Sequence, residues 1–502
     1  MSEKSLLLAI DQGTTSTRAL IYDEKGRCLG SSAMELTQHY PQPGWVEHDP
    51  EEIWKSVETV VPQALAAAKV GTKRIAAIGL TNQRETCLLW DPKTDTTVGR
   101  ALVWQDRRTT NFCREHQADE EWLVQKTGLV LDPYFSATKM RWLLHQDSSK
   151  RRDAEAGRLA GGTIDSFLIW RLTGCKTFAT DRTNASRTLL LNLKTGDWDQ
   201  ELCDYFGVPE AMLPGVLPSI GDYGVTSGLS FLPDGIPIAG VAGDQQAALV
   251  GQLGFERGDA KCTYGTGAFF LVHTGTEVIH SKHRLLTTLA ASANGQLQYA
   301  MEGSVFIAGA AVQWLRDGLH LIESSADVES LASKAEPDQQ VIFVPGLVGL
   351  GAPHWVPEAR GALFGLTRAT GAAELARAAL EGVAFQVVDL VEAACKDSNR
   401  SLESLRVDGG MSANAWFLQL QADLLGLPVV QAQERESTAL GAAFLAGLGI
   451  GLWSDVDNLR HLIQEPKTFH PRLSNENRTR RLEQWRGAVR TVIEYYRSRK
   501  PP

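Results

Sequence analysis

The stretch "LLLAIDQGTTSTRALIYDEKG", residues 6–26, contains two apolar runs separated by small and polar residues. We predict strands over residues 5–10 and 17–22, joined by a polar turn. Backbone N–H groups in such a turn can converge on an anion, and the hydroxyls of Thr14, Thr15 and Ser16 would add donors. A plain β-turn uses the same residue types, so this stretch alone leaves both interpretations open.

Asp11 closes the first apolar run, directly before the turn. A carboxylate there would repel phosphate unless a divalent cation lay between them, so Asp11 suits the magnesium side, usually through water. The chain contains no G-x-x-x-x-G-K-[ST], no strand-to-helix G-x-G-x-x-G, and neither H-R-D nor D-F-G. P-loop, Rossmann and protein-kinase folds are therefore disfavoured.

The length of the chain, 502 residues, predicts two large domains. Strand patterns alternate with helix patterns, such as the helix expected from Asp49 and the buried strand "RIAAIGLTN" after it, which indicates an α/β fold. The segment 214–243 is dense in Pro and Gly. We place a domain boundary just beyond it, giving domains over 1–250 and 251–502.

Charge and cysteine usage exclude several classes of protein. A formal net charge of −9 argues against nucleic-acid binding, and the longest uncharged stretches are interrupted by Pro, Gly or His, so membrane insertion is not expected. The seven cysteines are an odd number without the close pairing of zinc or dithiol motifs. These features favour the reducing cytoplasm.

The start of the second predicted domain repeats the strand-turn-strand pattern of residues 6–26. "DAKCTYGTGAFFLVHTG", residues 259–275, reads as strand, Gly-Thr-Gly turn and strand. Two such hairpins, one near the start of each half, suggest two related α/β domains that face each other.

Two acidic positions could carry chemistry. In "GLTNQRETCLLWD", residues 79–91, Arg84 and Glu85 follow a buried strand and could bind the hydroxyls of a polyol, although a surface ion pair is the more common role of an Arg-Glu step. In "IPIAGVAGDQQAALVG", residues 236–251, a strand delivers Asp244 to the start of a helix. Asp244 is either a base in a cleft or an N-cap.

Further positions are weaker candidates. Gly409 and Gly410 end a strand and would let backbone approach a flat ligand, with Asn414 one turn into the helix that follows. Gly309 and Gln313 share one helix face. Trp104 and Tyr134 would suit the CH faces of a small polyol, but a Trp or Tyr more often belongs to the core.

The order of these motifs along the chain resembles the FGGY family of carbohydrate kinases. The resemblance rests on "AIDQGTTSTR", "GLTNQRET", "LDPYFSATK", "TDRTNASRTLLLNL", "AGDQQAALVGQ", "TYGTGAFF", "EGSVFIAGAAVQWLRD", "GALFGLTRAT" and "VDGGMSAN", and covers residues 5–455. It implies two actin-like, ribonuclease-H-like ATPase domains with the active site in the cleft between them. "NQRET" and "GDQQ" point to glycerol as the substrate within this family.

The resemblance also implies a reaction and its residues: ATP and glycerol would give sn-glycerol 3-phosphate and ADP, with Mg²⁺. The phosphates would lie along Thr14, Thr15, Ser16 and Arg18, and the rest of the nucleotide would contact Thr266, Gly309, Gln313, Gly410 and Asn414. Glycerol would be held by Arg84, Glu85, Tyr134, Asp244 and Gln245, flanked by Trp104 and Phe269. The metal would lie near Asp11 and Asp244.

The physics of phosphoryl transfer agrees with these roles, because the reaction needs positioning, charge neutralisation and one base, here Asp244. We also expect a homodimer or homotetramer. Two alternatives remain: a kinase for a longer substrate such as xylulose or ribulose, and a catalytically silent regulatory protein on the same scaffold.

Overall fold

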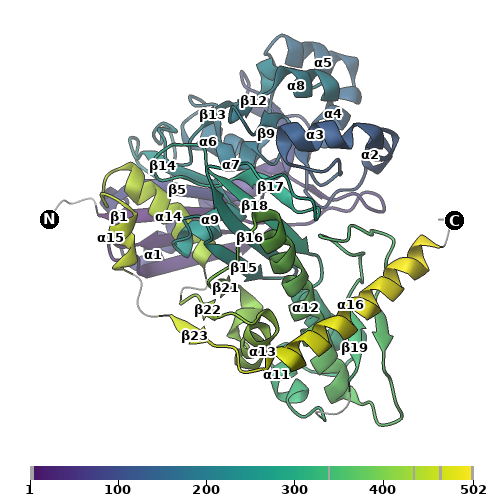
Figure 1. The fold of residues 1–502 in the computed structure, drawn as a ribbon. Coiled ribbons are helices and arrows are strands. Elements are labelled where there is room, and N and C mark those ends of the chain that lie inside the picture. Colours follow the sequence, from purple (N-terminus) through teal and green to yellow (C-terminus); the bar gives the residue numbers. More distant parts are fainter. Residues whose placement is uncertain (1–4, 337–339, 434–435, 463–465, 499–502) are drawn as a thin grey trace.

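The computed structural model describes residues 5–336, 340–433, 436–462 and 466–498. Two mixed sheets, each flanked by helices, form the two halves of the molecule (Figure 1). This arrangement confirms the predicted α/β class.

The first sheet has the strand order β14-β5-β1-β2-β3. Its strands are β1 (Leu6–Gln12), β2 (Ser16–Tyr22), β3 (Cys28–Glu35), β5 (Ile75–Asn82) and β14 (Ile238–Gly243). β1, β2 and β3 are antiparallel neighbours, whereas β5 and β14 run parallel to β1. The strands predicted over 5–10 and 17–22 are thereby confirmed.

The second sheet repeats this topology. Its order is β17-β18-β16-β15-β21-β22-β23, built from β15 (Ala260–Tyr264), β16 (Ala268–Gly275), β17 (Leu286–Leu289), β18 (Tyr299–Val305), β21 (Leu405–Asp408), β22 (Val429–Gln431) and β23 (Lys467–Phe469). The five strands from β18 to β22 have the same order and directions as the first sheet. The repeated hairpin in the sequence therefore reflects a repeated fold.

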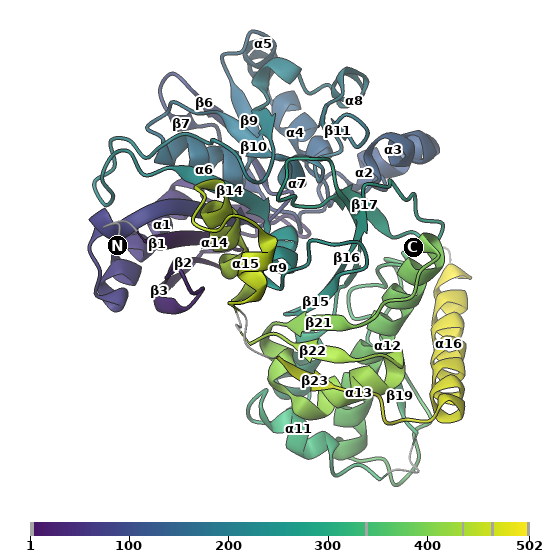
Figure 2. The same ribbon diagram turned by 60° about the vertical axis from the view of Figure 1, so that its left-hand side comes forward.

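Helices cover both sheets. α1 (Pro50–Ala68) packs on β2 and β3, and the side chain of its N-cap Asp49 accepts a hydrogen bond from the backbone of Glu51, as the sequence predicted. α12 (Ala372–Ser398), α13 (Ala415–Leu425) and α16 (Asn475–Arg497) lie with the second sheet (Figure 2). α10 (Gly309–Gln313) and α11 (Asp327–Ala332) lie in the same half.

One helix from the second half of the sequence belongs by packing to the first half. α14 (Ser437–Gly449) contacts β1, β5 and β14 and shares a hydrophobic core with them, while it crosses α9 (Asp244–Gly251). Figure 2 shows α14 beside the first sheet, away from α12 and α16. The chain thus returns to the first half after building the second, and the boundary near residue 250 stays a prediction.

The chain between β5 and β14 adds a further layer with its own core. Its elements include β6 (Cys87–Asp91), β7 (Thr96–Thr97), β8 (Ala101–Leu102), β9 (Ala160–Thr163), β10 (Ala179–Asp181), β11 (Leu191–Asn192), β12 (Asp197–Trp198), β13 (Gly215–Leu217), α2 (Thr110–Glu115), α3 (Glu120–Thr127), α4 (Ser136–His145), α5 (Ser148–Glu155), α6 (Ile164–Leu172), α7 (Arg182–Ala185) and α8 (Gln200–Phe206). The short strand β4 (Glu47–His48), which precedes β5 in the chain, pairs with β8 of this layer. The remaining elements are β19 (Ile342–Val344), β20 (Ala362–Phe364) and α15 (Val456–Arg460). Among the described residues, none of these helices is both long and apolar enough to cross a membrane.

Candidate active site

Several of the predicted site residues lie at or just beyond the ends of strands in both sheets. Asp11, Arg84 and Asp244 lie at the carboxyl ends of β1, β5 and β14, which are neighbours in the first sheet. The turn at 265–267 joins β15 and β16 of the second sheet. Because equivalent strand ends carry both sets, the repeated topology brings them toward one region.

The turn after β1 is tight and is fixed by hydrogen bonds from side chains elsewhere in the first half. The backbone N–H of Gly13 donates to the carbonyl of Ser16 at 2.9 Å, and the Gly13 carbonyl accepts from the Gln12 and Gln83 side chains at 2.7 and 3.2 Å. Trp104 Nε1 donates to Thr14 Oγ1 at 2.8 Å. These bonds fix the turn before any ligand arrives, which favours the phosphate-holding interpretation over a plain turn.

Acidic groups gather near this turn. The pKa of Asp11 is raised to about 7, chiefly by burial; Arg18 opposes this rise, and the carboxylates of Asp244 and Glu436 add to it. Arg18 pairs with Glu436 at the start of α14. The guanidinium of Arg18 is thus engaged by a carboxylate in this structure.

The described parts of the chain hold no group of three or more His, Cys, Asp or Glu side chains that could bind a metal ion. Mg²⁺ commonly uses one or two carboxylates and completes its shell with substrate phosphates and waters. Asp11, crowded by Asp244, fits that pattern, in which metal and nucleotide bind together.

Arg84 and Glu85 are buried, with 3% and 2% of their surfaces exposed. The surface-ion-pair alternative is therefore wrong. Glu85 also has a positive φ of 61°. Such backbone is uncommon for a residue with a side chain and persists only where the surroundings enforce it, often at functional sites.

Asp244 is the first residue of α9, whose N-cap is Gly243. The N-cap alternative is thus wrong. The Asp244 side chain, 30% exposed, lies with Oδ1 3.1 Å from Arg84 Nε. Its neighbour Gln245 accepts a hydrogen bond from the buried ammonium of Lys261. Asp244 is therefore a held, partly accessible carboxylate, as a base requires.

Three aromatic rings lie next to these groups. The Trp104 ring meets those of Tyr134 and Phe269 edge to face, with centroids 5.5 and 6.5 Å apart. The backbone around Tyr134 is fixed by Lys139, whose buried ammonium donates to the carbonyls of residues 133–135 at 2.7–2.9 Å. All three predicted polyol-flanking aromatics thus form one cluster.

Trp104 contacts the aromatic cluster with its ring and Thr14 with its indole N–H, and substitutions can separate these two contacts. Trp104→Phe keeps the aromatic wall but removes the bond to Thr14, which typically contributes about 1 kcal/mol. We expect the KM for ATP to rise roughly fivefold while the KM for glycerol changes less than about twofold. Initial-rate kinetics check this, and Trp104→Ala should raise both constants. Equal changes from Trp104→Phe in both constants would contradict the assignment.

The second half supplies the predicted nucleotide contacts. Gly309 N–H donates to the Gly265 carbonyl at 2.9 Å, and an added Cβ at Gly309 would meet that oxygen at 2.6 Å. Thr266 accepts from the backbone of residues 308 and 310, which joins the turn to α10. Gln313 lies one turn along the same helix and is exposed.

Gly410 follows Gly409, whose φ of 86° and close approach to the Tyr264 carbonyl require glycine. Asn414 is the N-cap of α13 and accepts from Phe417 N–H, and does not lie a turn inside the helix as the sequence suggested. The structure brings Thr266, Gly309 and Gly410 around the end of β15.

Sequence reasoning missed four buried charged residues that hold the site: Lys139, Arg187, Lys261 and Glu302. Arg187 and Glu302 lie within two of the quoted motifs, "TDRTNASRTLLLNL" and "EGSVFIAGAAVQWLRD". A charged residue directly beside apolar or small residues was the available indication, because buried charges need partners.

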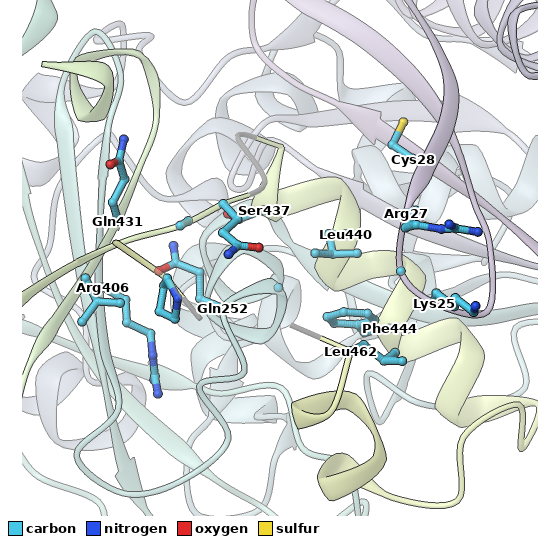
Figure 3. A pocket seen from close by; sticks show the side chains of 16 residues that line it. Lys25, Arg27, Cys28, Gln252, Arg406, Gln431, Ser437, Leu440, Phe444 and Leu462 are labelled. Atoms are coloured by element: carbon cyan, nitrogen blue, oxygen red, sulfur yellow. The ribbon is translucent and has the colours of Figure 1, made fainter. Parts of the chain in front are cut away.

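A separate cavity of about 390 Å³ lies at the other end of α9, beyond Gly251 (Figure 3). Lys25 and Arg27 of the first half, Arg406 of the second, and Leu440 and Phe444 of α14 line it. None of the predicted site residues lines this cavity.

The doubled ribonuclease-H-like topology and a carboxylate beside a hydroxyl-rich turn define a two-domain kinase of the actin-like ATPase class. Family models agree: the N-terminal domain of the FGGY family of carbohydrate kinases matches residues 6–251, and the C-terminal domain matches residues 260–450. The chain belongs to the FGGY family of carbohydrate kinases.

Within this family, the chain is similar to individual proteins that are named glycerol kinases. The chain is 52% identical over 492 residues to a glycerol kinase of Rhizobium rhizogenes, covering 97% of this chain and 99% of the relative. It is 53% identical over 487 residues to a glycerol kinase of Alkalilimnicola ehrlichii, covering 96% and 97%.

Solved structures show the same fold. The structure of Plasmodium falciparum glycerol kinase with ADP matches with a TM-score of 0.91 and 35% identity, covering 97% of this chain and 98% of the other. A xylulose kinase of Lactobacillus acidophilus matches with a TM-score of 0.87 and 24% identity, covering 98% and 99%. At that identity the second likeness supports the fold alone.

Proposed function

We propose that this chain is an ATP:glycerol 3-phosphotransferase, which converts glycerol and ATP to sn-glycerol 3-phosphate and ADP as the entry step of glycerol catabolism. The observation that carries the proposal is the carboxylate of Asp244 held 3.1 Å from the buried Arg84, beside Glu85 and the aromatic cluster. The named relatives, near 50% identity over almost the whole chain, support glycerol as the acceptor.

Each half has a role in this reaction. Glu85 accepts and Arg84 donates hydrogen bonds to glycerol hydroxyls, with Tyr134 and Gln245, while Trp104 and Phe269 cover its CH faces. Asp244 accepts the proton of the attacking hydroxyl at a carboxylate oxygen. The glycerol oxygen that has lost this proton forms the new bond to the γ-phosphorus, and the bond between the γ-phosphorus and the bridging oxygen of the β-phosphate breaks to release ADP.

The nucleotide lies between the two hairpins. The turn at Thr14, Thr15 and Ser16 donates to the phosphates, and Arg18 joins it after leaving Glu436. The rest of the nucleotide contacts Thr266, Gly309, Gln313, Gly410 and Asn414. Closure of the two halves would exclude water, which otherwise competes as phosphoryl acceptor.

Mg²⁺ would be held by Asp11, with Asp244 beside it, and would neutralise phosphate charge. We further propose that the enzyme works in the cytoplasm, because seven cysteines, an odd number without the close spacing of zinc or dithiol motifs, suit a reducing compartment. Assembly as a homodimer or homotetramer is part of the same proposal.

A coupled assay with pyruvate kinase and lactate dehydrogenase tests the function. Purified protein should use glycerol with a higher kcat/KM than dihydroxyacetone, xylulose or ribulose. Preference for a pentulose would replace the glycerol proposal by the alternative of a ketose kinase. No ADP formation with any acceptor would instead favour a silent protein on this scaffold.

A further inference from the structure

Glu302, on β18 in the second half, reaches across to the predicted glycerol-binding residues of the first. Only 3% of it is exposed. Its Oε2 accepts from Arg84 Nη1 at 2.6 Å and its Oε1 from Arg84 Nη2 at 3.2 Å. This bidentate arrangement fixes the plane of a guanidinium as well as its position.

The bidentate pair determines which nitrogen of the Arg84 guanidinium faces Asp244. Both terminal nitrogens are engaged by Glu302, so Nε is the nitrogen that approaches Asp244. Without Glu302, Gln246 Oε1 would still accept from Nη1, at 3.2 Å, whereas Nη2 would be free to pair with Asp244 directly. Such a pair would occupy the carboxylate that the attacking hydroxyl needs.

Arg187, from the segment after α7, completes the arrangement. It is fully buried, its Nε donates to Glu85 Oε1 at 2.6 Å, and its Nη2 lies 2.9 Å from Glu302 Oε1. Its guanidinium also lies over the ring of Tyr134, 5.4 Å from the centroid. Arg187 therefore touches two of the side chains assigned to glycerol.

Arg84, Glu85, Arg187 and Glu302 form a buried, charge-balanced group, which we call the Arg–Glu cluster. Burial disfavours the charge on Glu302, but Arg187 and Arg84 outweigh it and hold the pKa of its carboxyl below the usual range. Removing one member would leave an uncompensated buried charge, which is costly. The cluster is thus stable only when both halves contribute.

We propose that Glu302 and Arg187 are positioning residues for glycerol: they set the orientation of Arg84 and Glu85, so that the acceptor site depends on a carboxylate from the second half. This inference rests on the proposed function. It predicts that losing Glu302 affects glycerol far more than ATP, because the nucleotide contacts come from other segments.

Glu302→Gln tests the proposal, since it keeps the shape and removes the charge. We expect the KM for glycerol to rise about thirtyfold or more, while the KM for ATP stays within about twofold. Glu302→Asp restores the charge and should recover part of the loss. It also serves as the second variant if Glu302→Gln does not fold.

The double variant Glu302→Gln/Arg187→Gln restores charge balance. Its loss in kcat/KM for glycerol should be clearly smaller than the product of the two single losses, because the residues act through one cluster. Multiplicative losses would overturn the proposal.

Asp389→Asn provides a matched control. Asp389 lies on α12 in the same half and accepts from Trp485 Nε1 at 2.8 Å, away from the Arg–Glu cluster. This variant should lower the melting temperature without changing the KM for glycerol. An unchanged glycerol KM in Glu302→Gln would overturn the proposal, whereas wild-type protein inactive on glycerol would refute the proposed function.

Discussion

Asp244→Asn should fold and bind ATP but lose at least about a hundredfold in kcat, a typical contribution of a general base. Asp244 Oδ1 accepts from the Gln245 N–H at 2.7 Å and lies 3.1 Å from Arg84 Nε. An asparagine oxygen can keep both contacts, so the local structure should survive. What is lost is the basicity that takes the proton from glycerol. Stopped-flow or initial-rate kinetics measure kcat, and calorimetry measures ATP binding.

Asp199→Asn is the matched control for this substitution. Asp199 is the N-cap of α8 and pairs with Lys126 in the added layer of the first half, so its loss should lower stability and leave kcat unchanged. Near-normal kcat in Asp244→Asn would refute the assignment of the base. A loss of ATP binding together with kcat would assign Asp244 to the nucleotide or metal instead.

Local patterns predicted the elements that carry the site. Small polar residues between two apolar runs predicted the opening turn. The acidic N-cap Asp49, followed by Pro50 at the first helical position, predicted the start of α1. Asp244 was placed correctly at a strand-to-helix junction because both flanking patterns are strong. These interactions span few residues, so the sequence displays them directly.

Long-range partners could not be predicted in this way. Arg84 and Glu302 are separated by 218 positions, and no periodicity links them. The burial of Arg84 and Glu85 depends on that partner, and the sequence therefore left a surface ion pair open. The family resemblance named the residues that would touch ligands, yet it said nothing of Arg187 and Glu302, which hold them.

The place of α14 was equally hidden from the sequence. Its residues come after the whole second sheet, yet they complete the core of the first. Only the three-dimensional return of the chain shows that α14 supports α9, the helix that begins with Asp244. The packing of α14 against α9 therefore contributes to stability and also holds the helix that carries the proposed catalytic carboxylate.

This crossing gives the second large expected effect. A Cβ added at Gly441 of α14 would lie 1.8 Å from the Ala247 carbonyl oxygen of α9, and one added at Gly251 would lie 1.9 Å from the Ser437 carbonyl oxygen. Because the obstacles are backbone atoms, no side-chain rotation can relieve them. The helices can cross this closely only where glycine is present.

Gly441→Ala should therefore destabilise the protein by about 3 kcal/mol, the upper part of the usual range for overpacking. A melting temperature lower by roughly 3–6 °C is the expected readout, because the entropy of unfolding grows with chain length. Separation of the helices would also displace Asp244, so kcat should fall even at temperatures where the variant stays folded. Gly487→Ala in α16 is the control: no atom lies within 4 Å of the added Cβ, and the substitution should leave stability equal or slightly higher. If Gly441→Ala melted and turned over like Gly487→Ala, the close crossing would not be what positions Asp244.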